Sequence, residues 1–273
     1  MQDEVFRAVT RALDHGEPAA LVTVVATTGS TPQRVGAKML VFADGRTVGT
    51  IGGGCYEDDA AGKAREAIRL RQPLLARYDL NDDNAAESGL ICGGRMDVFI
   101  EPVEPAPHLY VAGAGHIGQE VARLAHQVGF LVHVVDDREK FANPERFPTA
   151  FEVAVADVAA WLASAVLAPR AYAVIVTRGH RHDLEALRAL AGRGLQFVGM
   201  IGSRAKVARV FDTLAAGGVP ADVLAGVHAP VGLDIGAVTP AEIAVSIVAE
   251  LVAARNGRLA APHVAAASLR SQR

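Results

Sequence analysis

The stretch from Leu109 to Arg138 constrains the fold more than any other part of the chain. A short apolar run, Leu109 to Ala112, leads directly into the turn Gly113-Ala114-Gly115-His116-Ile117-Gly118. A helical pattern follows, and a second apolar run ends at the acid Asp136. Strand, G-x-G-x-x-G turn, helix and second strand are typical of a Rossmann-like unit.

Each position in this turn has a physical role. Gly113 and Gly115 let the backbone turn and approach a pyrophosphate, and Gly118 lets helix and strand pack closely. The helix that begins near His116 offers free N–H groups to an anion. Asp136, about 20 residues on, would accept hydrogen bonds from a ribose and favour NAD(H) over NADP(H), although the nearby Arg138 opposes that preference. In the alternative interpretation, the glycines serve only the turn.

The second half of the chain keeps alternating between apolar runs and helical patterns. Such alternation predicts a doubly wound parallel sheet with helices on both faces. Ligands of these sheets bind beyond the carboxyl ends of the strands, so two further loops should face the same crevice. One contains His180. The other leads into a helix whose start suits a phosphate. Its residues are Gly202, Ser203, Arg204 and Lys206.

A proline-rich segment, residues 101–107, separates this half from the first. With three prolines in seven residues it should not continue a strand, and it is expected to be a linker. The predicted fold class is α/β, with a mixed α+β domain at 1–104, a Rossmann-like domain at 105–257 and a frayed tail at 258–273. Limited proteolysis should therefore cut near residues 101–107.

The first half predicts two helices and several strands. Its helices are expected near 3–15 and from Cys55 to Arg71, and a hairpin is expected to turn near Gly45. Further strands are expected at 19–26, 74–80 and 96–101, with a polar loop at 81–89.

Both cysteines lie against glycine runs. Cys55 follows Gly52-Gly53-Gly54 and should open a helix, where the helix dipole favours a thiolate. Cys92 precedes Gly93 and Gly94. Cys55 is either a reactive thiol or a small buried apolar residue. The two cysteine turns either form a shared cleft with two thiols or are independent of each other.

Composition excludes several classes of partner. The 273 residues are 51% hydrophobic and 21% charged, with a net charge of −3, as in an ordinary globular protein without a nucleic-acid-binding surface. No secretion signal or long apolar segment is evident, so we expect a cytoplasmic protein with no membrane partner and with reduced thiols.

Taken together, these motifs resemble the XdhC/CoxI family, the accessory proteins of xanthine dehydrogenase and related molybdenum hydroxylases. The resemblance covers nearly all of the chain. Its motifs are Gly29-Ser30-Thr31-Pro32, Gly36-Ala37-Lys38-Met39, Gly49-Thr50-Ile51-Gly52-Gly53-Gly54-Cys55 with Glu57, Cys92-Gly93-Gly94, the Gly113 turn, Asp136-Asp137-Arg138, Thr177-Arg178-Gly179-His180 with Asp183, Gly202-Ser203-Arg204 with Lys206, and Pro230 to Gly236.

The resemblance implies a homodimeric chaperone that binds the molybdenum cofactor, protects it while a cysteine desulfurase sulfurates it, and delivers it to a molybdenum hydroxylase. Cys55 and Cys92 would contact the molybdenum. Which domain holds the pterin stays open, and no catalytic residue can be assigned. The residues implied in cofactor binding are Gly52, Gly53, Gly54, Cys55, Glu57, Cys92, Gly93, Gly94, Gly113, Gly115, His116, Gly118, Asp136, Asp137, His180, Gly202, Ser203, Arg204 and Lys206.

Two alternatives compete with this interpretation. The Rossmann-like turn also fits an NAD(P)-dependent oxidoreductase, although no acid/base pair can be assigned from the sequence. A regulatory protein that senses a nucleotide is the third possibility. NAD(P) or another nucleotide is therefore a second candidate ligand.

Overall fold

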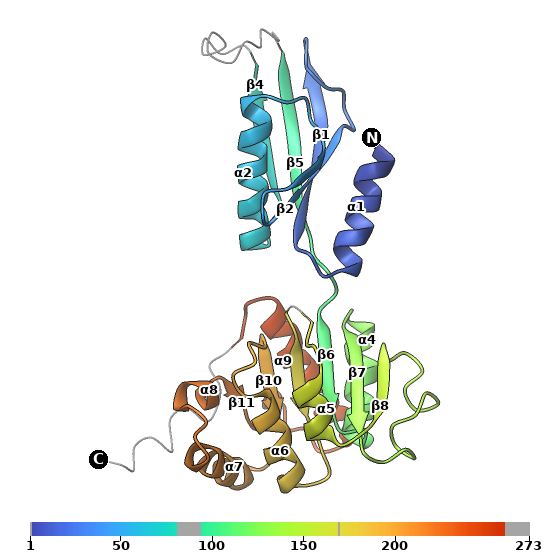
Figure 1. Ribbon diagram of the computed structural model, residues 1–273, viewed down its shortest axis with the longest axis vertical. Helices are drawn as coiled ribbons and strands as arrows, with labels where there is room; N and C mark the ends of the chain where they lie inside the picture. Colours follow the sequence, from blue (N-terminus) through green and yellow to red (C-terminus); the bar gives the residue numbers. More distant parts are fainter. Residues whose placement is uncertain (1, 81–93, 169, 260–273) are drawn as a thin grey trace, which may run out of the picture. The chain divides into compact units, whose positions relative to one another are not determined.

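The computed structural model describes residues 2–80, 94–168 and 170–259 and divides the chain into two compact units, residues 1–106 and 107–273 (Figure 1). Predicted features that lie outside the described residues are the 81–89 loop, Cys92, Gly93 and most of the tail.

Unit 1 is an antiparallel five-stranded sheet with one helix on each face. The strand order is β3-β2-β1-β5-β4. Because side chains of a strand alternate between faces, Val22 and Val24 of β1 pack toward α2, whereas Ala19 packs toward α1. The elements are α1 (Gln2–Asp14), β1 (Ala19–Thr28), β2 (Lys38–Phe42), β3 (Thr47–Gly49), α2 (Cys55–Leu70), β4 (Leu74–Asp79) and β5 (Arg95–Val103).

The expected end of a strand at Glu101 is wrong, because β5 continues to Val103 and includes Pro102. Pro102 pairs with Ala20 of β1 on one side. On the other side, the ladder with β4 ends where Leu74 pairs with Ile100, so no strand there requires the N–H that proline lacks.

Unit 2 confirms the predicted Rossmann-like α/β fold. Its parallel sheet has the order β11-β10-β9-β6-β7-β8, in which the direction of winding reverses between β6 and β9. The elements are β6 (His108–Ala112), α4 (His116–Gln127), β7 (Leu131–Asp136), β8 (Glu152–Val155), α5 (Val158–Ser164), β9 (Tyr172–Ile175), α6 (His180–Leu190), β10 (Phe197–Met200), α7 (Arg204–Ala216), α8 (Ala221–Ala225), β11 (Val227–His228) and α9 (Pro240–Arg255).

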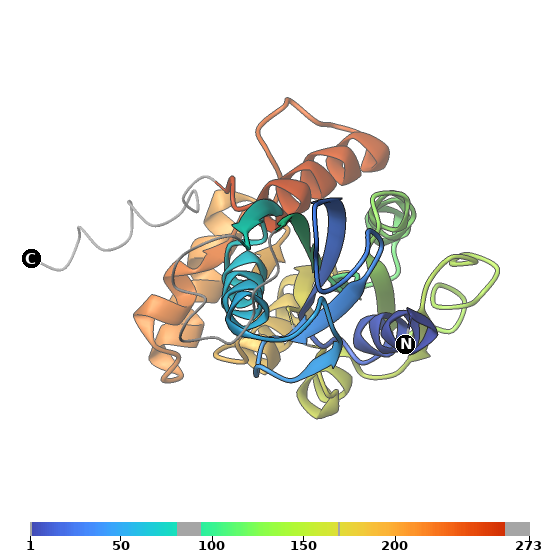
Figure 2. The same cartoon turned by 90° about the horizontal axis from the view of Figure 1, so that it is seen from above.

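Helices cover both faces of this sheet. Figure 2 shows α4 and α9 on one side and α5 and α6 on the other. Alternate residues of β6 enter the two cores: Leu109 and Val111 face α4 and α9, and Tyr110 and Ala112 face the opposite layer. This arrangement brings the loops after β6, β7, β9 and β10 to one edge of the sheet.

Candidate functional site

The triple-glycine turn of unit 1 closes around an acid of the same chain. Gly52, Gly53 and Gly54 all have positive φ, at 131°, 77° and 81°, which glycine adopts without strain. The Glu57 Oε2 atom accepts hydrogen bonds from the N–H groups of Ile51 (2.8 Å), Gly52 (3.1 Å) and Gly53 (2.9 Å). The Thr50 hydroxyl donates to the same oxygen at 2.5 Å.

These bonds change the acidity of Glu57. Burial raises the pKa of its carboxyl, but the hydrogen bonds from Thr50 and from the backbone N–H groups outweigh burial and lower the pKa overall. Glu57 is therefore a carboxylate at neutral pH, held by its own loop.

Cys55 is the first residue of α2 and is exposed as a free thiol. The interpretation of Cys55 as a small buried residue is wrong. Gly54 precedes it as the N-cap without a side-chain capping bond, and a Cβ at Gly53 would meet no atom within 4 Å. The thiol is thus open to a ligand, and no atom covers Gly53 on the side where a Cβ would lie.

The neighbouring loops approach the same turn. A Cβ at Gly52 would come within 2.8 Å of Pro32, from the loop that follows β1. Gly94 is buried against that loop, since a Cβ there would come within 2.3 Å of the Ser30 carbonyl oxygen. One end of the sheet therefore brings the Pro32 loop beside the Cys55 turn, and Gly94 packs against the same loop.

The turn after β6 has the geometry that its sequence predicts. A Cβ on Gly113 would meet the Val176 carbonyl oxygen at 2.5 Å, and one on Gly118 would meet the Gly113 carbonyl oxygen at 2.0 Å. Gly115 has open space around it and begins α4 with no side-chain cap. The next residue, His116, is exposed.

Asp136, predicted to bind a ribose, is buried and already bonded within unit 2. It accepts hydrogen bonds from the Ala114 N–H at 2.8 Å and from the Arg138 guanidinium at 2.8 and 2.9 Å. Burial raises the pKa of Asp136, but Arg138 and the Ala114 N–H lower it overall. The sequence identified Arg138 only as a neighbour and did not predict this pairing.

Asp137 is exposed and pairs with Arg178, which follows β9, at 2.7 Å. Since β6 lies between β7 and β9 in the sheet, this ion pair joins the loops on either side of the Gly113 turn. A charge at the end of each flanking strand was the only sequence signal for it.

The phosphate site predicted at the start of α7 is also bonded internally. Lys206 pairs with Asp183 of α6, which is fully buried, and Asp183 accepts a hydrogen bond from the Thr177 hydroxyl at 2.6 Å. Ser203 caps α7 by accepting from the Lys206 N–H. Gly202 packs against the Lys206 side chain, and Arg204 is exposed.

The predicted site residues consequently fall into two groups. Of the unit 1 residues, Gly52, Gly53, Gly54, Cys55 and Glu57 form the Cys55 turn, Gly94 packs against the loop that contains Ser30, and Cys92 and Gly93 lie outside the described residues. Those of unit 2 line the carboxyl edge of the parallel sheet, where His180 is exposed at the start of α6. That helix begins at His180, directly after its N-cap Gly179.

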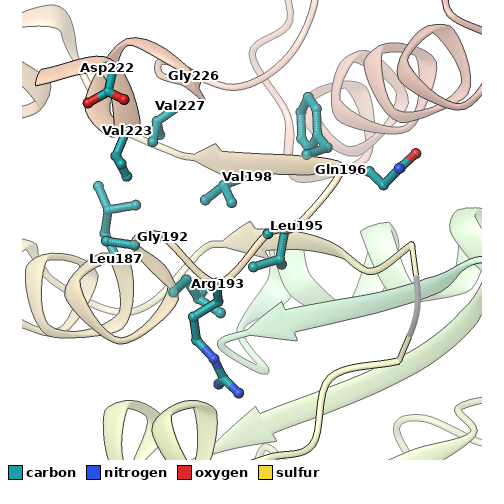
Figure 3. A pocket seen from close by; sticks show the side chains of 14 residues that line it. Leu187, Gly192, Arg193, Leu195, Gln196, Val198, Asp222, Val223, Gly226 and Val227 are labelled. Carbon is teal, nitrogen blue, oxygen red and sulfur yellow. The ribbon is translucent and has the colours of Figure 1, made fainter. Parts of the chain in front are cut away.

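A pocket of about 310 Å³ lies elsewhere, between the end of α6, the amino end of β10 and α8 (Figure 3). Leu187, Val198, Val223 and Val227 make it largely apolar. It belongs to the opposite edge of the sheet from the Gly113 turn and contains none of the predicted site residues.

Metal-binding clusters and membrane spans are both absent from residues 2–80, 94–168 and 170–259. No group of three or more His, Cys, Asp or Glu side chains in that part of the chain could hold a metal ion. No described helix is long and apolar enough to cross a membrane.

Comparison with known proteins matches both units. The XdhC and CoxI family matches residues 12–79, and the XdhC Rossmann domain matches residues 109–251. The Escherichia coli protein YqeB is 36% identical over 92% of this chain, which spans only 46% of YqeB. The chain therefore covers about half the length of this curated relative.

Two further relatives have informative names. A Bacillus subtilis protein, named as a probable subunit of xanthine dehydrogenase, is 26% identical over 89% of this chain and 95% of its own length. The Escherichia coli "Molybdenum cofactor insertion chaperone PaoD" is 32% identical over 38% of this chain and 33% of its own length.

A crystal structure described as a xanthine dehydrogenase from Bacillus halodurans has a similar fold. Its TM-score is 0.52 at 23% identity, over 93% of this chain and 96% of that one. Because the two family matches together cover most of the chain and unit 2 has the Rossmann-like fold, the chain belongs to the XdhC and CoxI family.

Proposed function

We propose that this protein is an accessory chaperone of a xanthine dehydrogenase-type molybdenum hydroxylase. It binds the molybdenum cofactor, protects it while a cysteine desulfurase converts it to the sulfurated form, and delivers it to the hydroxylase. In this proposal it acts as a homodimer. The observation that carries the proposal is the exposed Cys55 thiol at the start of α2 in unit 1.

Family membership and the names of two relatives support this role, since one is named as a cofactor insertion chaperone and the other as a probable part of xanthine dehydrogenase. The chemistry of the turn supports it as well. A cysteine sulfur is a suitable ligand for a soft metal centre. Cys92, outside the described residues, is proposed as a second thiol.

The fit between turn and cargo is partial. An exposed thiol and an approachable backbone suit the metal end of the cofactor. The N–H groups of Ile51, Gly52 and Gly53 already hold Glu57, so they do not fit its phosphate. The phosphate must find its donors elsewhere.

Incubation of the purified full chain with free molybdenum cofactor, followed by gel filtration and metal analysis, tests the proposal. Molybdenum and pterin absorbance should elute with the protein. The Cys55→Ser variant should retain less of both, whereas Asp58→Asn, which changes an exposed neighbour on α2, should behave as the parent. A parent protein that elutes without molybdenum would contradict the proposal.

A second candidate ligand is a nucleotide at the Gly113 turn, as in an NAD(P)-dependent oxidoreductase. The open α4 N-terminus at Gly115 favours it. Ribose binding by Asp136 would require Arg138 to release that carboxylate. Calorimetric titration with NAD(H) and NADP(H) tests this candidate, and binding of neither would leave the turn with an architectural role.

A further inference from the structure

Three consecutive left-handed glycines give the loop before α2 an unusual shape. Successive backbone N–H groups of a turn can converge on an anion and form a nest. In this chain the converging groups belong to Ile51, Gly52 and Gly53. A nest of this kind commonly receives a phosphate or another ligand anion.

Here the anion belongs to the protein. All three N–H groups and the Thr50 hydroxyl donate to a single oxygen of Glu57, at 2.5 to 3.1 Å. Thr50 also accepts a hydrogen bond from the Gly52 N–H at 2.9 Å, which ties the hydroxyl into the same network. The acid is the third residue of α2, so the first turn of the helix itself supplies the anion that orders the loop before it.

The same contacts determine where Cys55 lies. In the sequence, Cys55 lies between the residues of the nest and Glu57, and it is exposed whereas Ile51 and Tyr56 are buried. The bonds to Glu57 tie the loop to the first turn of α2, where the thiol is exposed. Without these bonds, three glycines would leave the loop free to sample many conformations.

We propose that Glu57 is a positioning residue that occupies the nest as an internal anion, excludes ligand phosphate from it, and thereby holds Cys55 in place. The consequence for cofactor binding rests on the proposed function. The occupancy of the nest by Glu57 does not.

Hydrogen exchange of the backbone amides of residues 51–53 tests the occupancy in the full chain without any cofactor. These amides should be protected in the parent and in Asp58→Asn. In Glu57→Ala they should exchange at least about tenfold faster, since a hydrogen bond to a charged group typically contributes more than the equivalent of tenfold. Added acetate, a free carboxylate, should restore protection in Glu57→Ala and leave Asp58→Asn unchanged.

Equal exchange in the parent and Glu57→Ala would overturn the proposal, and so would further protection of the parent amides by added inorganic phosphate. If Glu57→Ala fails to fold, Glu57→Gln serves instead, because its amide keeps one acceptor oxygen. It should show intermediate protection that acetate does not improve.

Retention of the molybdenum cofactor gives the second readout. Glu57→Ala should lose cofactor together with amide protection, and acetate should restore both. Full retention by a variant with unprotected amides would show that Glu57 does not position Cys55. A parent that protects its amides but binds no cofactor would refute the proposed function and leave Glu57 as the occupant of the nest.

Discussion

The two glycine-rich turns of this protein each bond to an acid of the same chain, but with different results. Glu57 accepts hydrogen bonds from three backbone N–H groups of the Gly52 turn. Together with the hydrogen bond from Thr50, they lower the pKa of Glu57. Asp136 accepts a hydrogen bond from one N–H group of the Gly113 turn, that of Ala114, and forms an ion pair with Arg138. The first turn is filled, whereas the second keeps an open helix N-terminus at Gly115.

This difference shows that a glycine-rich turn before a helix is not in itself a phosphate site. What matters is whether an internal acid already occupies the converging donors. In unit 1 the available group is the Cys55 thiol, and in unit 2 it is the backbone at the start of α4.

The largest expected effect on the free energy of unfolding distinguishes a glycine that packs closely against backbone from one with free space around it. Gly118→Ala should destabilise unit 2 by about 3 kcal/mol, because its Cβ would overlap the Gly113 carbonyl oxygen, a backbone atom. Gly115→Ala should cost less than about 1 kcal/mol, since its space is open and its φ of −66° suits alanine. Denaturant unfolding followed by the fluorescence of Trp161 measures both, and equal costs would contradict the contrast.

The next effect concerns the cation that pairs with the acid of the second turn. Arg138→Met should lower the free energy of unfolding of unit 2 by about 2 kcal/mol, because it leaves the buried Asp136 carboxylate without its guanidinium. Arg123→Met, which removes an exposed pair with Glu120 on α4, should stay within about 0.5 kcal/mol. Similar losses in the two variants would show that Arg138 does not compensate Asp136.

At low pH, protonation of Glu57 should weaken the hydrogen bonds that hold the Gly52 turn. Its pKa in the folded protein lies below the ordinary value of 4.5, so its contribution is complete above that pH and is lost as the pH falls through the lower, folded value. Glu57→Gln should therefore be less stable than the parent by about 1.5 kcal/mol at neutral pH, and the two should converge in acid. Circular dichroism melts across this pH range measure the difference, and a gap that is constant with pH would refute the assignment.

The smallest effect on stability is expected at Cys55. Serine is close to cysteine in size and the side chain is exposed, so Cys55→Ser should change the free energy of unfolding by no more than about 0.5 kcal/mol. A larger loss in thermal or denaturant unfolding would mean that the thiol has a structural role and does not serve ligand binding.

Local sequence signals predicted much of this fold. The G-x-G-x-x-G spacing identified the βαβ unit. Thr239-Pro240-Ala241-Glu242 has the sequence of a capping box with proline at the first helical position, and α9 begins there with both capping bonds formed. The short elements α8 and β11 were missed, since so few residues carry no detectable periodicity.

The site was harder to predict because its bonds depend on tertiary structure. Asp136 reaches Ala114 only when β7 lies beside β6, and Lys206 reaches Asp183 only when the starts of α6 and α7 are neighbours. Glu57 is different, because it lies close in sequence to the residues whose N–H groups donate hydrogen bonds to it. An acid shortly after a glycine run could have indicated a filled nest.

Molybdenum retention by Cys55→Ser and Gly115→Ala, measured side by side with the parent after gel filtration, tests the central claim most directly. The claim is that the cofactor binds at the Cys55 turn and not at the Gly113 turn. Cys55→Ser should lose most of the bound molybdenum while Gly115→Ala retains it. Retention by Cys55→Ser together with loss by Gly115→Ala would place the cofactor in unit 2 and contradict this account.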